Sequence, residues 1–117
     1  MRNLHEIVKF GGKMDTLYNA NYFIMVAEDM GFVIDHMGST RIVGYYGELE
    51  TALTAVKENR CDIYENTYKY AIVEEVFPGL YPFAPNRWFF EYNRRTGEYN
   101  LIDEPPVYSN YANLTIG

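Results

Sequence analysis

Cysteine and histidine are scarce in this chain of 117 residues, and their shortage excludes two kinds of protein. The only cysteine, Cys61, rules out an internal disulfide framework and favours a reducing, cytoplasmic setting. His5, His36 and Cys61 lie far apart without the paired spacing of metal ligands. We therefore expect neither a metal site nor another cofactor.

Long apolar runs are also missing from the sequence. No window approaches the ~20 apolar residues that a membrane span needs. Residues 1–10 contain no apolar core of signal-peptide length. The sequence thus predicts a soluble protein that is not exported.

Basic residues are few compared with acidic ones. Ten lysines and arginines stand against sixteen aspartates and glutamates, which gives a formal net charge of −6. Because attraction to phosphate dominates most nucleic-acid binding, this net negative charge argues against non-specific binding to nucleic acid or to an anionic membrane. Two interpretations stay open: a solvated acidic surface, or an acidic face that competes with nucleic acid for a basic groove on another protein.

Tyrosine and phenylalanine, in contrast, are abundant. Aromatic residues make up 17% of the chain, with twelve tyrosines and seven phenylalanines. Tyrosine suits both half-buried sheet faces and binding surfaces, because its ring packs while its hydroxyl stays hydrated. Most tyrosines fall in strand-like runs, which favours sheet packing.

The clearest periodic segment is residues 47–60, which predicts one amphipathic helix. Four apolar residues recur at helical spacing and form one face: Leu49, Ala52, Leu53 and Val56. Gly47 is expected at the N-cap, and Asn59 suits the left-handed turn that ends a helix. Cys61, directly after the helix, is expected to be a small packing residue.

Strands are predicted on both sides of this helix. The runs are residues 22–28, 32–34, 41–46, 70–76, 87–93 and 98–103, with the first two paired as a hairpin. A helix through residues 23–37 is the alternative for that first pair. Gly44 suggests either a β-bulge or a close approach of another backbone segment, and Gly97 suits a hairpin turn with positive φ. Residues 1–20 and 106–117 show no firm period, and we expect a loose arm and either an edge strand or a mobile tail.

Together these elements predict a single α+β domain over residues 1–117. One helix packs on an antiparallel sheet of about five strands, which is a two-layer sandwich. No internal repeat or linker interrupts it.

No catalytic motif accompanies this fold. Cys61 and His36 carry no local signature of a nucleophile pair. Asp62 and Glu65, three residues apart, are more typical of surface charge than of a metal site. Glu74 and Glu75 are adjacent in a strand, point to opposite faces and cannot share a cation. We therefore predict a protein that is not an enzyme, with no catalytic and no metal-binding residues.

The segment 87–95 offers one argument for nucleic-acid or nucleotide binding. Arg87, Arg94 and Arg95 flank an aromatic strand, and rings beside cations often hold single strands. The opposing interpretation is that Trp88, Phe90 and the rest of the aromatic stripe form the core face. The acidic net charge favours the core interpretation.

A protein–protein role is the favoured prediction. The segment 77–85, FPGLYPFAP, is long for a hairpin connection and rich in aromatic and aliphatic residues. It either recognises a partner or folds over the open end of the core. The predicted partner-binding residues are Asp62, Tyr64, Glu65, Tyr68, Glu74, Glu75, Leu80, Tyr81 and Phe83.

Residues 45–103 resemble small uncharacterised proteins that bacteriophages and prophages encode. The shared features are a tyrosine pair before the helix, a CDIYE-like connection and the strings YAIVEEV, PGLYP, RWFFEYN and EYNLIDEPP. That group usually carries an acidic or hydroxyl residue at the helix cap, where this chain has Gly47, and it offers no active site to transfer.

The resemblance implies a binder of host machinery in the bacterial cytoplasm. Such binders include inhibitors of bacterial defence nucleases such as CRISPR effectors. We thus expect a host protein as partner, no membrane contact and no direct contact with nucleic acid. Self-association is left open.

Overall fold

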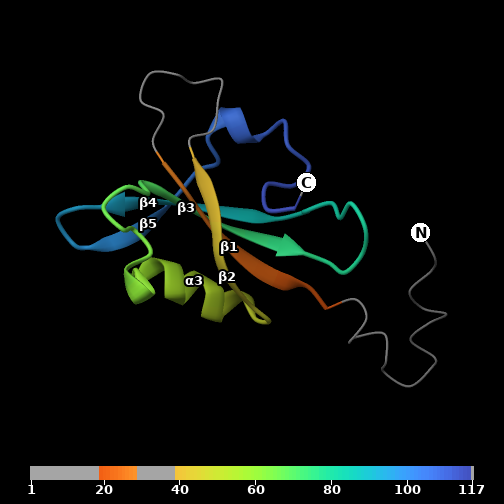
Figure 1. The fold of residues 1–117 in the computed structure, drawn as a ribbon, viewed down its shortest axis with the longest axis horizontal. Coiled ribbons are helices and arrows are strands. Elements are labelled where there is room, and N and C mark those ends of the chain that lie inside the picture. Colours follow the sequence, from red (N-terminus) through yellow and green to blue (C-terminus); the bar gives the residue numbers. More distant parts are fainter. Residues whose placement is uncertain (1–18, 29–38, 117) are drawn as a thin grey trace.

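The computed structural model describes residues 19–28 and 39–116, and Figure 1 shows their arrangement. The elements in chain order are β1 (Asn21–Ala27), β2 (Thr40–Tyr46), α3 (Leu49–Lys57), the 3₁₀ turn η1 (Arg60–Asp62), β3 (Tyr70–Val76), β4 (Arg87–Asn93), β5 (Glu98–Ile102) and the 3₁₀ turn η2 (Pro106–Tyr108). One helix packs on a five-stranded antiparallel sheet, so the predicted α+β sandwich is confirmed.

The sheet has the strand order β2-β1-β3-β4-β5. The predicted run 32–34 lies outside the described residues, and β1 pairs with β2 on one side and with β3 on the other. Opposite β1, Ile24 pairs with Gly44 and Met25 pairs with Ile42, so the extra residue of a bulge lies between Gly44 and Ile42. The bulge predicted from Gly44 is confirmed. Gly97 takes a φ of 74° in the β4–β5 turn, as expected.

Helix α3 is shorter than the predicted segment 47–60. Its N-cap is Glu48, whose backbone is extended, so the expectation of Gly47 at the cap is wrong by one residue. Asn59 takes the left-handed conformation with a φ of 51°, which ends the helix as predicted. Cys61 is also left-handed and exposed, so it is not the packing residue that we expected. The chain turns away from the helix there.

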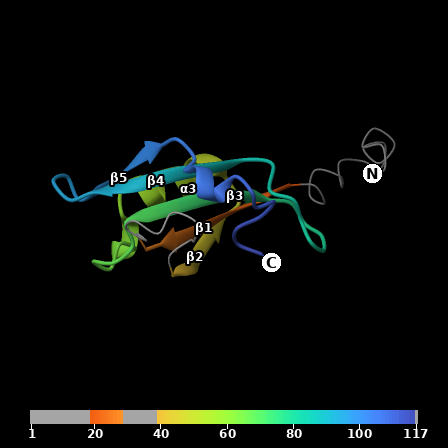
Figure 2. The same ribbon diagram turned by 90° about the horizontal axis from the view of Figure 1, so that it is seen from above.

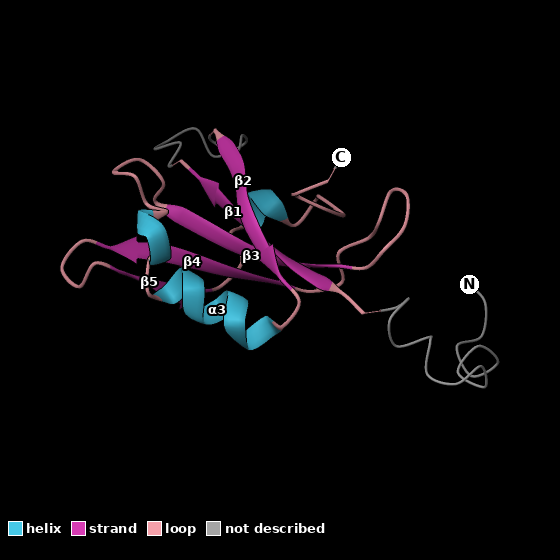
Figure 3. Cartoon of the chain, turned by 60° about the horizontal axis from the view of Figure 1, so that its bottom comes forward, coloured by secondary structure: helices cyan, strands magenta, loops and turns pink. Residues whose placement is uncertain are grey.

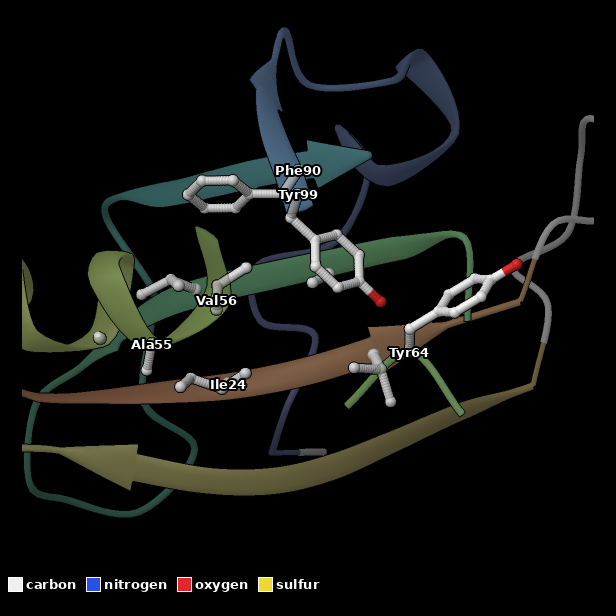
Figure 4. Close-up of a cluster of buried hydrophobic side chains, with 10 residues drawn as sticks. Ile24, Ala55, Val56, Tyr64, Phe90 and Tyr99 are labelled. Carbon is white, nitrogen blue, oxygen red and sulfur yellow. The ribbon is translucent and has the colours of Figure 1, made fainter. Parts of the chain in front are cut away.

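The helix covers one face of the sheet, which we call the helix face (Figures 1 and 3). Its buried residues Ala52, Ala55 and Val56 lie on apolar strand residues such as Ile24 and Phe90 (Figure 4). Leu49 and Leu53, which the pattern also placed on the apolar face, are half-buried and pack at the margin of this cluster. The helix face is therefore closed by apolar contacts.

Residues 106–116, which we call the C-terminal tail, lie on the opposite face of the sheet, the tail face (Figures 1 and 2). A second buried cluster joins Met25, Ile72 and Phe89 of the strands to Tyr108 of the tail. The rings of Phe89 and Tyr108 are 5.0 Å apart. The tail is thus neither an edge strand nor a detached arm, because it packs across a sheet face that α3 does not cover.

Candidate protein-binding surface

The β3–β4 loop, residues 77–86, carries the most exposed apolar side chains of the described part of the chain. Leu80 is 93% exposed, Tyr81 is 95% exposed and Phe83 is 66% exposed. These three residues belong to the predicted partner-binding set. The alternative, a loop folded over the open end of the core, does not apply to its tip.

The base of this loop is held by hydrogen bonds on both sides. On the strand side, the Glu75 amide donates to the Asn86 carbonyl at 3.0 Å and the Asn86 side-chain amide donates to the Glu75 carboxylate at 2.9 Å. On the tail side, the Ala84 amide donates to the Ala112 carbonyl at 3.0 Å, and the Asn113 side chain donates to the Pro82 carbonyl at 3.2 Å. The apolar tip therefore projects from a fixed base.

Below the loop, the tail is held by a buried ion pair. Arg87 at the start of β4 donates to the Glu74 carboxylate at 3.1 Å and to the Glu104 carboxylate at 3.0 Å. Arg87 also donates to the carbonyls of Tyr108 and Tyr111 in the tail. The guanidinium thus joins β4, on which it lies, to β3, to the segment after β5 and to the tail.

The Glu74 carboxylate completes this network from the other side. It accepts from the Leu114 amide at 2.7 Å, from the Thr115 amide at 3.0 Å and from the Thr115 hydroxyl at 2.7 Å. With Arg87, these donors satisfy a carboxylate that is 0% exposed. Such a charge is tolerated in the interior only because it is paired and fully hydrogen-bonded.

Two residues of the predicted partner-binding set are therefore not at the surface. Glu74 is buried in the network with Arg87, so its assignment to the contact surface is corrected. Tyr64 is buried too, because its ring stacks on Tyr92 at a centroid distance of 3.7 Å. Both side chains hold the fold together.

Glu75 remains at the surface beside the loop. It points to the face opposite Glu74, as predicted, and accepts from the Tyr22 hydroxyl at 3.2 Å. Burial and the neighbouring Glu75 carboxylate raise the pKa of Tyr22. Glu75 is thus a half-buried member of the loop base.

The other predicted contacts lie at the far end of β3, around η1. Asp62 and Glu65 are exposed, and Glu65 pairs with Arg41 at 3.3 Å. Tyr68 is half-buried, and its carbonyl accepts from the Tyr99 hydroxyl at 2.6 Å. The seven-residue strand β3 separates this group from the loop by roughly 20 Å. The predicted set thus divides into two separate surfaces.

The three arginines of the nucleic-acid hypothesis are also divided. Arg87 lies at the loop end of β4, 11% exposed and paired with Glu74 and Glu104. Arg94 and Arg95 lie past the opposite end of that strand, exposed, and form no ion pair among the described residues. A predicted site that combines all three arginines does not form.

Arg94 and Arg95 border a surface cavity of about 550 Å³. Asn93, Asn100 and Glu91 line the same cavity. Glu91 pairs with Lys69 at 3.3 Å. This end of the hairpin therefore places two exposed cations at a hollow of mixed polar and apolar lining, which also includes Tyr92 and Ile102.

Two features of the described residues bear on catalytic and metal chemistry. Residues 19–28 and 39–116 contain no cluster of three side chains that could hold a metal ion. Burial raises the pKa of the Tyr99 phenol, and the nearby groups Tyr64, Tyr92 and Asp62 raise it further. Its hydroxyl is already occupied by the Tyr68 carbonyl.

The residues that sequence reasoning missed are Glu104 and the tail residues Tyr111, Leu114 and Thr115. One signal was present. The predicted strands 70–76 and 87–93 each place one charge near the loop end of what the structure shows to be the tail face. These two residues, Glu74 and Arg87, are paired in the register of the sheet. The tail gave no such signal, because most of its hydrogen bonds to Arg87 and Glu74 use backbone groups.

Comparison of the chain with protein-family models, with curated proteins and with solved structures gave no match. No helix in the described part of the chain is long and apolar enough to cross a membrane.

Proposed function

We propose that this chain is a non-enzymatic protein-binding module whose contact surface is centred on the β3–β4 loop. The exposure of Leu80, Tyr81 and Phe83 is the observation that carries the proposal. Exposed apolar residues on an anchored loop lose little conformational entropy on binding and gain burial of a large apolar area. Tyrosine and other aromatic residues are also the commonest energetic anchors of interfaces.

The partner we propose is a host protein in the bacterial cytoplasm, and specifically a basic, nucleic-acid-binding surface of a defence nuclease such as a CRISPR effector. Three observations support this class. The chain carries a net charge of −6. Glu75, Asp103 and Glu104 lie beside or behind the loop, whose residues 77–86 include no charge. Residues 45–103 resemble phage-encoded proteins, a group that includes such inhibitors.

The contact surface is tested by the double variant Leu80→Ser, Tyr81→Ser in a pull-down from bacterial lysate. We expect the wild-type chain to retain a stoichiometric partner and the double variant to lose it. Leu101→Ser is the matched control, because Leu101 is an exposed apolar residue on β5, away from the loop. Equal recovery by all three chains would show that the loop is not the contact surface.

The partner class is tested by a plasmid-interference assay in cells with an active CRISPR system. Expression of the wild-type chain should restore transformation by a targeted plasmid, and the loop variant should not. Continued interference across the nuclease types tested, despite a captured partner, would reject the inhibitor role and retain the binding role.

A second candidate function is single-stranded nucleic-acid or nucleotide binding at the β4–β5 hairpin. The observation that favours it is the pair of exposed arginines, Arg94 and Arg95, that line a surface cavity together with Tyr92. Fluorescence titration with single-stranded DNA, RNA and cyclic nucleotides tests it, with Arg94→Gln, Arg95→Gln as the variant. Salt-sensitive, micromolar binding that this variant loses would favour it over the first candidate.

A further inference from the structure

We propose that the groove between the β3–β4 loop and the C-terminal tail binds a cationic side chain, arginine or lysine, of a partner protein. This inference rests on the proposed function, since it names the partner chemistry that the same surface recognises. Its basis is the shape of the groove, the charge at its floor and the rings at its sides.

The groove is a cavity of about 430 Å³ on the tail side of the loop. Its lining includes Phe83 and Asn86 from the loop end, Arg87 and Glu104 from the ion-pair network, and Asn110 and Tyr111 from the tail. The loop and the tail lie side by side here in Figures 1 and 2, joined by the hydrogen bond from Ala84 to Ala112. The walls of the groove are thus tied together.

The charge at the floor of the groove is negative overall. Among the described residues that line the groove, Arg87 is the only lysine or arginine, and two carboxylates, Glu74 and Glu104, bind it. Two carboxylates and one guanidinium leave one net negative charge. Four of the five guanidinium N–H groups are engaged by these carboxylates and by two tail carbonyls, so Arg87 has little donor capacity left for an anion.

Glu104 is the member of this network whose negative charge is accessible to solvent. Its side chain is about one-third exposed, whereas the Glu74 carboxylate is buried. Only its Oε1 accepts from Arg87, and its Oε2 accepts no hydrogen bond from the described residues. A carboxylate has room for further donors, so Glu104 can receive the N–H groups of an incoming cation.

The aromatic rings at the sides of the groove favour the same ligand. Phe83 and Tyr111 both line it and both are exposed. The face of an aromatic ring attracts ammonium and guanidinium groups, and the ring also packs on the aliphatic stem of lysine or arginine. A groove with aromatic sides and an acidic floor therefore selects a basic side chain over an acidic or neutral one.

The test is an NMR titration of the ¹⁵N-labelled full chain at about 10 mM salt, where screening is weak. The probes are N-acetyl-arginine methylamide, its lysine counterpart and the neutral isostere N-acetyl-citrulline methylamide. We expect both cations to shift the amides of Asn86, Arg87 and Glu104 and citrulline to leave them unchanged. Two variants, Glu104→Gln and Phe83→Leu, should each weaken arginine binding about fivefold.

Glu98→Gln is the matched control, because Glu98 is an exposed carboxylate at the opposite end of β5 that does not line the groove. It should bind arginine like the wild type. Phe83→Leu leaves the Arg87 network intact, so its effect on binding cannot come from a disturbed ion pair. Equal shifts with citrulline, shifts at other residues, or full affinity in both variants would overturn the proposal.

The arginine titration and the pull-down can fail independently of each other. A chain that loses its partner through the Leu80, Tyr81 variant but does not bind the arginine probe retains the binding function without a cation pocket. A chain that binds arginine in the groove but keeps its partner in the loop variant has the pocket and a different contact surface.

Discussion

The two faces of the sheet are closed by different physical means. The helix face is covered by α3 through apolar contacts, with Val56 and Phe90 at its centre. The tail face is covered by a segment of irregular backbone, which the Glu74–Arg87 pair holds through hydrogen bonds. The interior of a helix satisfies its own backbone groups, whereas an irregular tail needs partners for them. This difference explains why a buried ion pair lies on the tail face, where it serves those backbone groups.

The two faces should also lose stability in different ways when a residue is replaced. Apolar packing loses stability in proportion to the volume removed. A buried charge network fails abruptly when one member is removed, because the remaining charge is left unpaired in the interior. The proposed binding surface depends on the charge network, because the base of the β3–β4 loop is hydrogen-bonded to the tail that this network holds.

The largest effect is expected from Arg87→Ala. The variant leaves Glu74 buried without its guanidinium, which should lower the free energy of unfolding by about 3–5 kcal/mol. Urea denaturation followed by tryptophan fluorescence measures this loss. Arg94→Ala, an exposed arginine past the other end of β4, should change the value by no more than about 0.5 kcal/mol. Similar losses in both variants would mean that Arg87 is not buried in the network.

A pair of neighbouring phenylalanines compares the two faces directly. Phe90 contacts the helix-face cluster and Phe89 contacts Tyr108 of the tail. We expect Phe90→Ala to cost about 3–5 kcal/mol and Phe89→Ala to cost about 1 kcal/mol less, because the tail can move into the space more easily than a helix. The same urea experiment tests this order, and a larger loss for Phe89→Ala would reverse the comparison.

Much of this fold could be predicted from the sequence because its helix and strands carry periodic apolar patterns. The strands 70–76 and 87–93 were predicted with the bounds that the structure shows. The tail could not be predicted, since backbone amides that bind Glu74 look the same for every residue type. Tyr64 was wrongly assigned to the contact surface, because its stacking on Tyr92 depends on a chain reversal at residues 59–66 with several left-handed residues.

The candidate site was predicted only in part. The sequence placed Leu80 and Tyr81 among the contact residues but left open a loop folded over the core, and the structure exposes both side chains. Glu74 was misplaced because the strand register could point to Arg87, but nothing in the sequence showed that the tail would cover this pair. The groove required the loop, the segment after β5 and the tail together, and their proximity is a property of the tertiary fold.

A smaller effect is expected from Thr115→Val, which removes one donor to Glu74 and keeps the shape of the side chain. The loss of a hydrogen bond to a buried carboxylate should cost about 1.5–3 kcal/mol. Faster hydrogen exchange should be confined to the tail, at the Leu114 and Thr115 amides, while the α3 amides keep their protection. Thr51→Val, at an exposed position of α3, is the matched control. Equally faster exchange in α3 would mean that the two faces open as one unit.

The smallest effect at neutral pH is expected from Tyr99→Phe on the helix face. The hydroxyl donates to the Tyr68 carbonyl, so its loss should cost about 1 kcal/mol at pH 7. Above pH 10 the difference in the free energy of unfolding between this variant and the wild type changes. Burial raises the pKa of Tyr99 in the folded chain, whereas the unfolded chain titrates near its usual value of about 10.

The sign of the pH effect follows from which state holds the proton. Between the two pKa values the folded chain keeps the Tyr99 proton and the unfolded chain loses it, so stability falls as pH rises. This phenol alone should remove up to about 1.4 kcal/mol per pH unit above pH 10, and Tyr99→Phe removes that slope. Urea midpoints from pH 8 to 11 should therefore decline less steeply for the variant. The pKa of Tyr22 is also raised, so the stability of both the wild type and Tyr99→Phe should still fall to some extent as pH rises. Parallel curves for the two proteins would show that Tyr99 is not desolvated, and that the apolar closure of the helix face admits water at this position.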